Sequence, residues 1–133
     1  MNAVFADTYY YLALVSRRDA GHQRAAAFSR TYSGSVLTTA WVLTEVADAL
    51  ASPDQRGLFV ALLGDLKRDP QTTVAEPTIE LFAAGCDLFS QRPDKSWSLT
   101  DCISFVAMRE HGLTEVLTAD RHFDQAGYTA LLR

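Results

Sequence analysis

The chain has 133 residues, of which 48% are apolar and 21% are charged, and its net charge is −4. This length suits one domain with its own core, taken here as residues 1–133, and the composition excludes an intrinsically disordered chain. No apolar run approaches the roughly 18 residues that span a bilayer, and no basic leader precedes the first strand, so we expect neither a membrane span nor a signal peptide.

The charge and the cysteines narrow the class of protein further. A net negative chain is not typical of a nucleic-acid binder, but acids gathered around metal ions would make the total misleading, so nucleic acid is not excluded. Cys86 and Cys102 lack metal-ligand spacing and fall in apolar helical patterns. We expect both to be buried, reduced thiols in a cytoplasmic protein rather than one disulfide.

The first half of the chain alternates short apolar strands with helices. Val4–Ala6 predicts a buried strand with Asp7 at its carboxyl end. Ser52-Pro53-Asp54 indicates a helix stop and restart, because proline is tolerated in a first helical turn and serine can cap it. A second strand is expected over residues 35–39, and helices over residues 8–15, 22–30, 41–50 and 58–66.

The second half continues the same alternation. Gly112 ends a strongly apolar helix at the expected C-cap position. Strands are expected over residues 72–75, 115–118 and 128–132, and helices from Pro77 to Phe89 and from Asp101 to Glu110. The pattern predicts a single α/β domain whose mainly parallel sheet of four to five strands is flanked by helices on both faces.

Asp101 stands at the start of that apolar helix. Ser98 and Asp101 have the spacing of a capping box, in which each side chain bonds the other residue's free backbone N–H. Ile103 and Val106 then recur at helical spacing. Taken alone, this pattern predicts only a capped core helix. The rest of the chain favours more, because other acids stand at comparable ends of apolar strands.

Four acids fall where ligands collect in open parallel sheets, beyond the carboxyl ends of the strands and near the topological switch point. Asp7 follows the first strand, and Asp120 lies two residues after the end of the fourth. Glu45 lies early in the helix after the second strand, and Asp101 opens a helix that leads to a strand. Chance can produce such a set among sixteen acids. Carboxylates without His or Cys partners nevertheless suit hard cations such as Mg²⁺ or Mn²⁺ rather than zinc.

Four short motifs resemble those of PIN-domain ribonucleases. They are Phe5-Ala6-Asp7-Thr8, Leu43-Thr44-Glu45-Val46, the segment from Trp97 to Phe105, and Leu117-Thr118-Ala119-Asp120-Arg121-His122-Phe123. The third and fourth are the specific ones, and the resemblance covers essentially the whole chain. Within the family, the size and the absence of added domains resemble the VapC-like toxins of type II toxin–antitoxin systems.

The resemblance implies a metal-dependent endoribonuclease with an α/β/α sandwich fold. Asp7, Glu45, Asp101 and Asp120 would be its catalytic residues and would hold one or two Mg²⁺ or Mn²⁺ ions. The ions would orient a water and stabilise charge on the scissile phosphate of an RNA substrate.

The resemblance also implies protein partners. A small antitoxin would send a helix into a groove and a basic residue to the acids. The family tends to form homodimers, and Tyr10 and Leu14 on the first helix offer apolar surface for one.

Neighbouring polar residues are candidates for supporting roles. Thr8, Thr100 and Thr118 stand beside the acids and can hydrogen-bond a phosphate, a water or a carboxylate. Asp124 follows Asp120 at helical spacing, either as an additional metal ligand or as a solvated loop acid.

Four further residues lie near the motifs. Arg121 and Lys95 fall in loops and are either RNA contacts or solvated charges. His122 stands beside Asp120 and is close to the predicted site, although its pattern does not favour a general-base role. Tyr9 stands two residues after Asp7, where the family often carries a small polar residue.

Other functions remain open at this point. The chain could be a catalytically silent PIN-like module that binds RNA or protein, although such a module has no need to concentrate repelling carboxylates. It could be a free-standing RNA-processing nuclease without an antitoxin. A phosphatase is a weaker alternative, because an Asp-x-Asp pair after the first strand would place an acid where Tyr9 stands.

Overall fold

The computed structural model describes residues 2–133 and is built around one five-stranded sheet. The strand order is β3-β2-β1-β4-β5, and every neighbouring pair is parallel. The strands are β1 (Ala3–Ala6), β2 (Ser35–Thr39), β3 (Thr72–Ala75), β4 (Glu115–Leu117) and β5 (Thr129–Ala130). The parallel sheet that the alternating pattern predicted is confirmed.

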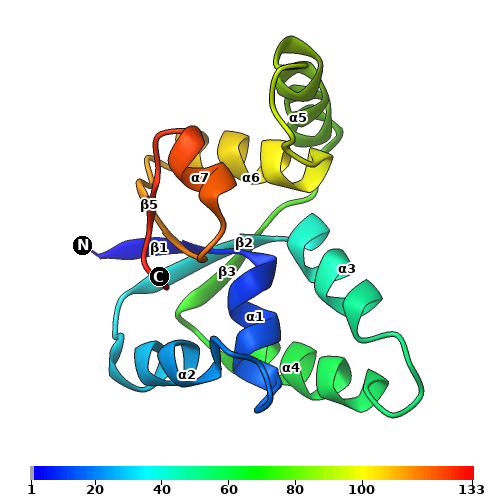
Figure 1. The fold of residues 1–133 in the computed structure, drawn as a ribbon, viewed down its shortest axis with the longest axis vertical. Coiled ribbons are helices and arrows are strands. Elements are labelled where there is room, and N and C mark those ends of the chain that lie inside the picture. The colour runs from blue at the N-terminus through cyan, green and yellow to red at the C-terminus, as the bar shows by residue number, and fades with distance from the viewer. Residues whose placement is uncertain (1) are drawn as a thin grey trace.

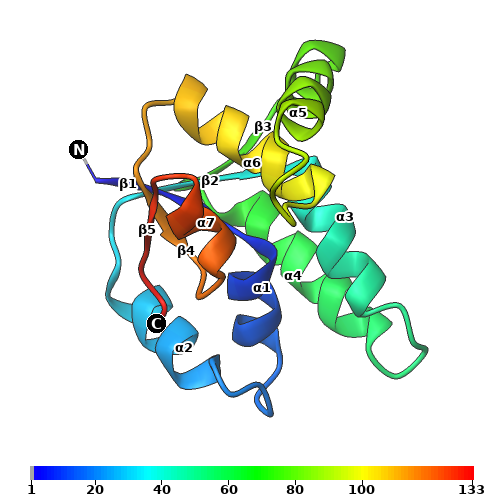
Figure 2. The same cartoon turned by 45° about the horizontal axis from the view of Figure 1, so that its top comes forward.

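Helices cover both faces of the sheet, as in an α/β/α sandwich. They are α1 (Thr8–Val15), α2 (His22–Thr31), α3 (Ala40–Ala49), α4 (Arg56–Arg68), α5 (Ile79–Gln91), α6 (Leu99–Glu110) and α7 (Arg121–Gln125). Figure 1 shows α1, α2 and α4 on one face of the sheet, with α6 and α7 on the other. In both views α6 lies between α5 and α7 (Figures 1 and 2).

The core is centred on β1 and α6. Val4, Phe5 and Ala6 are buried because β1 has a strand on each side and helices on both faces. Every residue from Asp101 to Met108 is buried, since α6 lies between the sheet and α5. The two helices approach closely at Gly85, where a Cβ atom would overlap the side chain of Ile103.

The direction of the crossovers changes at β1. The chain passes from β1 outward to β2 and β3, and then returns across the sheet to β4, which pairs with the other side of β1. The carboxyl ends of β1 and β4 therefore flank the topological switch point, where open α/β sheets bind their ligands. Asp7 directly follows β1, and Asp120 follows β4 at the start of α7.

Several local predictions needed correction. The fifth strand is Thr129–Ala130 rather than 128–132, and the sequence did not predict the five-residue α7. Helix α4 begins at Arg56, and Ser52 does not cap it, because the Ser52 hydroxyl bonds the side chains of two neighbours instead. Gly112, with a φ of 66°, ends α6 as predicted.

Two global expectations can also be compared with the structure. None of the helices within residues 2–133 is long and apolar enough to cross a membrane. Cys86 and Cys102 are both free thiols, as expected. Cys102 is buried, but Cys86 is only half-buried, because α5 packs on α6 and leaves its outer side to solvent.

Candidate active site

A cavity of about 510 Å³ lies at the carboxyl ends of the central strands. All four predicted acids line it, although they come from four separate parts of the chain. Its lining residues are Asp7, Thr8, Tyr9, Glu45, Ser98, Asp101, Ala119, Asp120 and His122. We call this space the carboxylate cavity. Its position agrees with the switch point between β1 and β4.

Thr118 links the acids that follow these two strands. Its Oγ1 atom donates a hydrogen bond to Oδ2 of Asp7 at 2.9 Å and accepts one from the backbone N–H of Asp120 at 3.1 Å. Thr118 is fully buried, so its hydroxyl has no competing solvent. One side chain at the end of β4 thus fixes the orientation of Asp7 and the backbone of Asp120 together.

Asp7 is the most deeply buried of the four acids, with 5% of its surface exposed. Burial raises the pKa of Asp7 from 3.8 to about 7, although hydrogen bonds from Thr118 and from the backbone of Thr8 oppose the rise, and nearby Asp101 and Glu45 add to it. A buried carboxyl with such a pKa carries its charge at modest cost only when a cation is close.

Glu45 reaches the cavity from the middle of α3. The Thr8 hydroxyl, at the first position of α1, donates a hydrogen bond to Oε1 of Glu45. Thr8 and Thr118 therefore each hold one carboxylate, which is one of the three kinds of partner that the sequence left open for them.

Asp101 is both a helix cap and a wall of the cavity. The capping box is present: the backbone N–H of Ser98 donates to Oδ2 of Asp101 at 3.1 Å, and Ser98 Oγ accepts from the backbone N–H of Asp101 at 3.0 Å. Oδ2 of Asp101 also lies 2.9 Å from Nδ1 of His122. Capping thus fixes the carboxylate and does not remove it from the cavity.

Asp120 and His122 line the cavity beside Asp101. The Asp120 side chain caps α7 by accepting the backbone N–H of His122 at 2.9 Å on Oδ1, and its Oδ2 lies 3.5 Å from Nδ1 of His122. Ligand atoms of Asp101, Asp120 and His122 all fall within 4.8 Å of one another, close enough to share one metal ion.

This donor set fits a divalent cation. Four carboxylates, one within α3, one in the first turn of α6 and two that cap α1 and α7, supply the oxygen ligands that Mg²⁺ and Mn²⁺ prefer, and His122 adds a nitrogen. Burial raises the pKa of Asp7, and the nearby charges of Asp101 and Glu45 raise it further, so a cation in the cavity would favour the ionised carboxylate. The arrangement can therefore support metal-assisted hydrolysis.

A comparison with known families agrees with this geometry. The sequence profile of the PIN domain family matches residues 4–127, which include every residue that lines the carboxylate cavity. The chain belongs to the PIN domain family. No curated protein matches the chain significantly.

Solved structures include a close match in fold to this PIN domain. The toxin VapC20 of Mycobacterium tuberculosis, described as cleaving the sarcin–ricin loop, superposes with a TM-score of 0.88. The alignment covers 98% of this chain and 99% of that one, at 23% sequence identity. At this identity the likeness establishes a shared fold.

Some predicted residues of the PIN domain lie outside the carboxylate cavity. Thr100 in α6 does not line it. Asp124 in α7 pairs with Arg133. Arg121 is exposed beside Asp120, and Lys95 stands over the ring of Trp97, with Nζ 5.9 Å from its centroid.

His122 contacts the acids of the cavity more closely than sequence reasoning anticipated. It was placed near the site, but its contacts with two acids were not predicted. The partner Asp101 is 21 positions away in the chain, and α7 is too short to show a helical period. The sequence feature that could have indicated these contacts is the position of His122, two residues after the predicted ligand Asp120.

Proposed function

We propose that this PIN domain is a metal-dependent endoribonuclease and the toxin of a VapBC-like toxin–antitoxin pair. The observation that carries the proposal is the convergence of Asp7, Glu45, Asp101 and Asp120 in one cavity. Membership of the PIN family and the likeness in fold to a toxin that cleaves the sarcin–ricin loop support the same function. The carboxylates suit hydrolysis of a phosphodiester bond, whose charge a bound cation offsets.

One or two Mg²⁺ or Mn²⁺ ions would be held by Asp7, Glu45, Asp101 and Asp120, with a nitrogen of His122 as a further donor. When bound, such an ion lowers the pKa of a water and stabilises charge on the scissile phosphate. The protein's own contribution is to hold the donors in place: Thr118 orients Asp7, Thr8 orients Glu45, and the capping box orients Asp101.

In this proposal Asp7 also couples cation binding to the release of a proton. Because burial raises its pKa to about 7, the carboxyl keeps a proton in a substantial fraction of metal-free molecules at neutral pH. It must release that proton from its carboxylate oxygen to become a ligand, so cation binding and proton release are linked at this residue.

RNA would approach across the rim of the cavity. Arg121 is exposed next to Asp120, and Lys95 stands over Trp97, which directly precedes the cavity residue Ser98. Both cations can meet phosphates on either side of the scissile bond and offset the repulsion of the acids. The sarcin–ricin loop is the first defined RNA to test, because a protein of the same fold cleaves it.

A small antitoxin is the proposed regulatory partner. A basic side chain placed between the carboxylates would pair with them and occupy the position of the metal ion. Such a partner would bind tightly to the metal-free cavity and would lose affinity when Asp101 is replaced by Asn. Binding of a candidate antitoxin with and without Mn²⁺ measures this competition directly.

A homodimer is also proposed, but not through the surface first expected. Tyr10 is buried against Phe28 and Tyr11, and Leu14 is half-covered, so α1 offers little apolar surface. Light scattering between 1 and 100 micromolar, taken as roughly the range where standard interfaces assemble, tests for the dimer.

The central experiment is cleavage of a labelled mixed RNA pool and of a sarcin–ricin-loop RNA with Mg²⁺, Mn²⁺ or EDTA. Wild type is compared with Asp7→Asn and Asp101→Asn, and with the exposed control Asp48→Asn on α3. We expect cleavage that requires the cation, is lost in both cavity variants and is kept by the control. Equal cleavage by Asp101→Asn and wild type would refute the proposal.

A further inference from the structure

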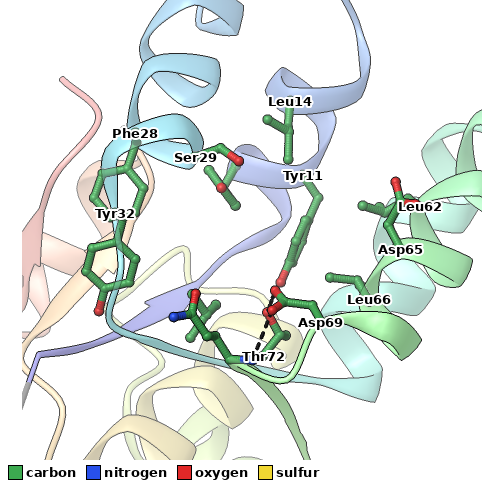
Figure 3. A pocket seen from close by; sticks show the side chains of 13 residues that line it. Tyr11, Leu14, Phe28, Ser29, Tyr32, Leu62, Asp65, Leu66, Asp69 and Thr72 are labelled. Carbon is green, nitrogen blue, oxygen red and sulfur yellow. Dashed lines mark hydrogen bonds between the residues drawn. The ribbon is translucent and has the colours of Figure 1, made fainter.

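A second cavity, of about 250 Å³, lies between α1, α2, α4 and the turn that leads into β3 (Figure 3). It shares no lining residue with the carboxylate cavity. Four aromatic rings and two carboxylates contribute to its walls, namely Tyr10, Tyr11, Phe28, Tyr32, Asp65 and Asp69. No Lys, Arg or His lines it. We call it the aromatic cavity.

The hydroxyl of Tyr11 has no partner in hydrogen-bonding geometry among the described residues, because the neighbouring Thr38 hydroxyl donates to the Ala6 carbonyl, and the Tyr11 residue is only 2% exposed. Figure 3 shows its hydroxyl end directed toward Asp69 and Thr72. Burial raises the pKa of Tyr11, so the hydroxyl is protonated at neutral pH. Buried polar groups are almost always paired, so this hydroxyl can accept a ligand atom once a small side-chain movement in the wall uncovers its oxygen.

Asp69 is anchored but has bonding capacity to spare. Its Oδ1 accepts the backbone N–H of Gln71 at 2.9 Å, and its Oδ2 accepts the Thr72 hydroxyl at 2.7 Å. A carboxylate offers about four acceptor positions, so two remain. Asp65, in contrast, is exposed and paired with Arg68 at 2.9 Å. Asp69 is therefore the main negative charge that a ligand in this cavity would meet.

The aromatic rings, like Asp69, favour a positively charged ligand. Phe28 and Tyr32 stack with their centroids 4.7 Å apart, and Tyr10 meets Phe28 edge-on at 6.3 Å. Ring faces carry negative potential and attract ammonium and guanidinium groups within about 6 Å. The Tyr32 hydroxyl is already used, since it donates to the Ser35 carbonyl. The rings thus supply apolar walls, while Asp69 and Tyr11 supply polar contacts.

We propose that the aromatic cavity binds a small organic cation, an ammonium or guanidinium group on a short apolar body. The cation would donate to Asp69 and to the free Tyr11 hydroxyl, and its apolar body would lie against Phe28 and Tyr10. A bare metal ion fits poorly, because rings and aliphatic side chains form much of the wall and offer no oxygen ligands. RNA phosphates are disfavoured, because the lining has carboxylates and no cation.

The test uses four probes in two matched pairs, with wild-type full-length protein. Butylguanidinium is compared with neutral butylurea, and benzylammonium with neutral benzyl alcohol. Binding is followed by calorimetry and by the ring resonances of labelled tyrosines. We expect each cation to bind at least about tenfold more tightly than its neutral partner, as a charge-assisted hydrogen bond requires.

Three variants then locate the site. Asp69→Asn keeps an acceptor for the backbone of Gln71 but removes the charge, and Tyr11→Phe removes only the unpaired hydroxyl. Each should weaken cation binding by about fivefold or more. Tyr11→Phe should leave the melting temperature unchanged or higher, which shows that the variant is folded. Tyr128→Phe, whose hydroxyl bonds the Phe105 carbonyl outside this cavity, is the control and should bind the cations like wild type.

The proposal would be overturned if the neutral probes bound as tightly as the cations, or if no cation bound at millimolar concentration. It would also be overturned if Asp69→Asn and Tyr11→Phe bound the cations as tightly as wild type. The source of the cation is decided by a further probe. Tighter binding of N-acetyl-arginine methylamide than of butylguanidinium indicates an arginine side chain of a protein, and the reverse order indicates a free small molecule.

Discussion

The two cavities contain the same kind of charge in different surroundings. In the carboxylate cavity, acids within α3 and α6 meet the acids that cap α1 and α7 at the ends of strands, and hydroxyls and an imidazole hold them. In the aromatic cavity, Asp69 is the main charge among rings and aliphatic side chains. Several converging oxygens suit an inorganic ion, whereas one acid among rings suits an organic cation. The neighbours of a carboxylate, more than the carboxylate itself, indicate its ligand.

The largest predicted difference between the cavities is the effect on RNA cleavage of replacing one aspartate by asparagine in each. Asp101→Asn should lower RNA cleavage by about 10³-fold, close to 4 kcal/mol of barrier, because it removes a ligand charge while the amide oxygen still accepts from Ser98. Asp69→Asn should leave the cleavage rate unchanged. Single-turnover cleavage of both variants checks this, and an equal loss in both would mean that the two sites are not independent.

Asp7 should make the stability of the metal-free protein depend on pH. The folded-state pKa is raised from 3.8 to about 7, so this residue's contribution is fully present below pH 4 and is lost as pH rises to 7. Asn does not ionise. In EDTA, Asp7→Asn should therefore exceed wild type by about 2 to 4 kcal/mol in unfolding free energy at pH 8 and by little at pH 4.

Urea unfolding at several pH values measures this difference. All other titrating groups are common to the two proteins, so their contributions cancel. Parallel curves of stability against pH for the two proteins would contradict the raised pKa of Asp7.

Removing the buried hydroxyl of Thr118 and removing that of Tyr11 should change the stability of the protein in opposite directions. Thr118→Val loses a donor to Asp7 and an acceptor for Asp120, and should cost about 1 to 3 kcal/mol of stability. Tyr11→Phe breaks no bond and should be neutral or stabilising by up to about 1 kcal/mol. Chemical denaturation of both variants in EDTA compares them. A large loss in Tyr11→Phe would show that its hydroxyl is already paired.

The smallest expected effect concerns the choice of metal ion. His122→Asn should lower Mn²⁺ affinity by about tenfold, because imidazole nitrogen suits Mn²⁺ better than Mg²⁺. Mg²⁺ affinity should change by less than about threefold, since magnesium takes oxygen ligands. Calorimetric titration with each ion makes the comparison, and the exposed His111→Asn is the matched control. Equal losses for the two ions would assign His122 a purely structural role.

Much of the carboxylate cavity was accessible from the sequence. Asp7 and Asp120 could be placed because parallel strands bring their carboxyl ends to one edge, so a strand pattern fixes where the next residue lies. Asp101 could be placed because it opens a helix that leads to a strand, and Glu45 because it lies early in the helix after the second strand. The contacts of His122 could not be predicted, because they depend on how α7 turns against α6, and five residues show no period.

The aromatic cavity was not accessible from the sequence in the same way. Tyr9, Tyr10 and Tyr11 are consecutive, so they face different sides of α1, and the pattern does not say which side is covered. Tyr10 was expected at a surface. It is buried because α2 folds back and places Phe28 against it. Contacts between helices that are joined by irregular turns leave no spacing signal in the chain.

The central place of β1 in the sheet also bears on how the protein is made. β1 is the first strand of the sheet to be synthesised, but β4, which pairs with one side of it, is the fourth of five. Asp7 and Thr118 are 111 positions apart. The ribosome must therefore translate through β4 before the central strand pair can form, and contacts between such distant residues slow folding. For the proposed nuclease, a nascent chain that lacks β4 also lacks Thr118 and Asp120, so it cannot yet assemble the carboxylate cavity.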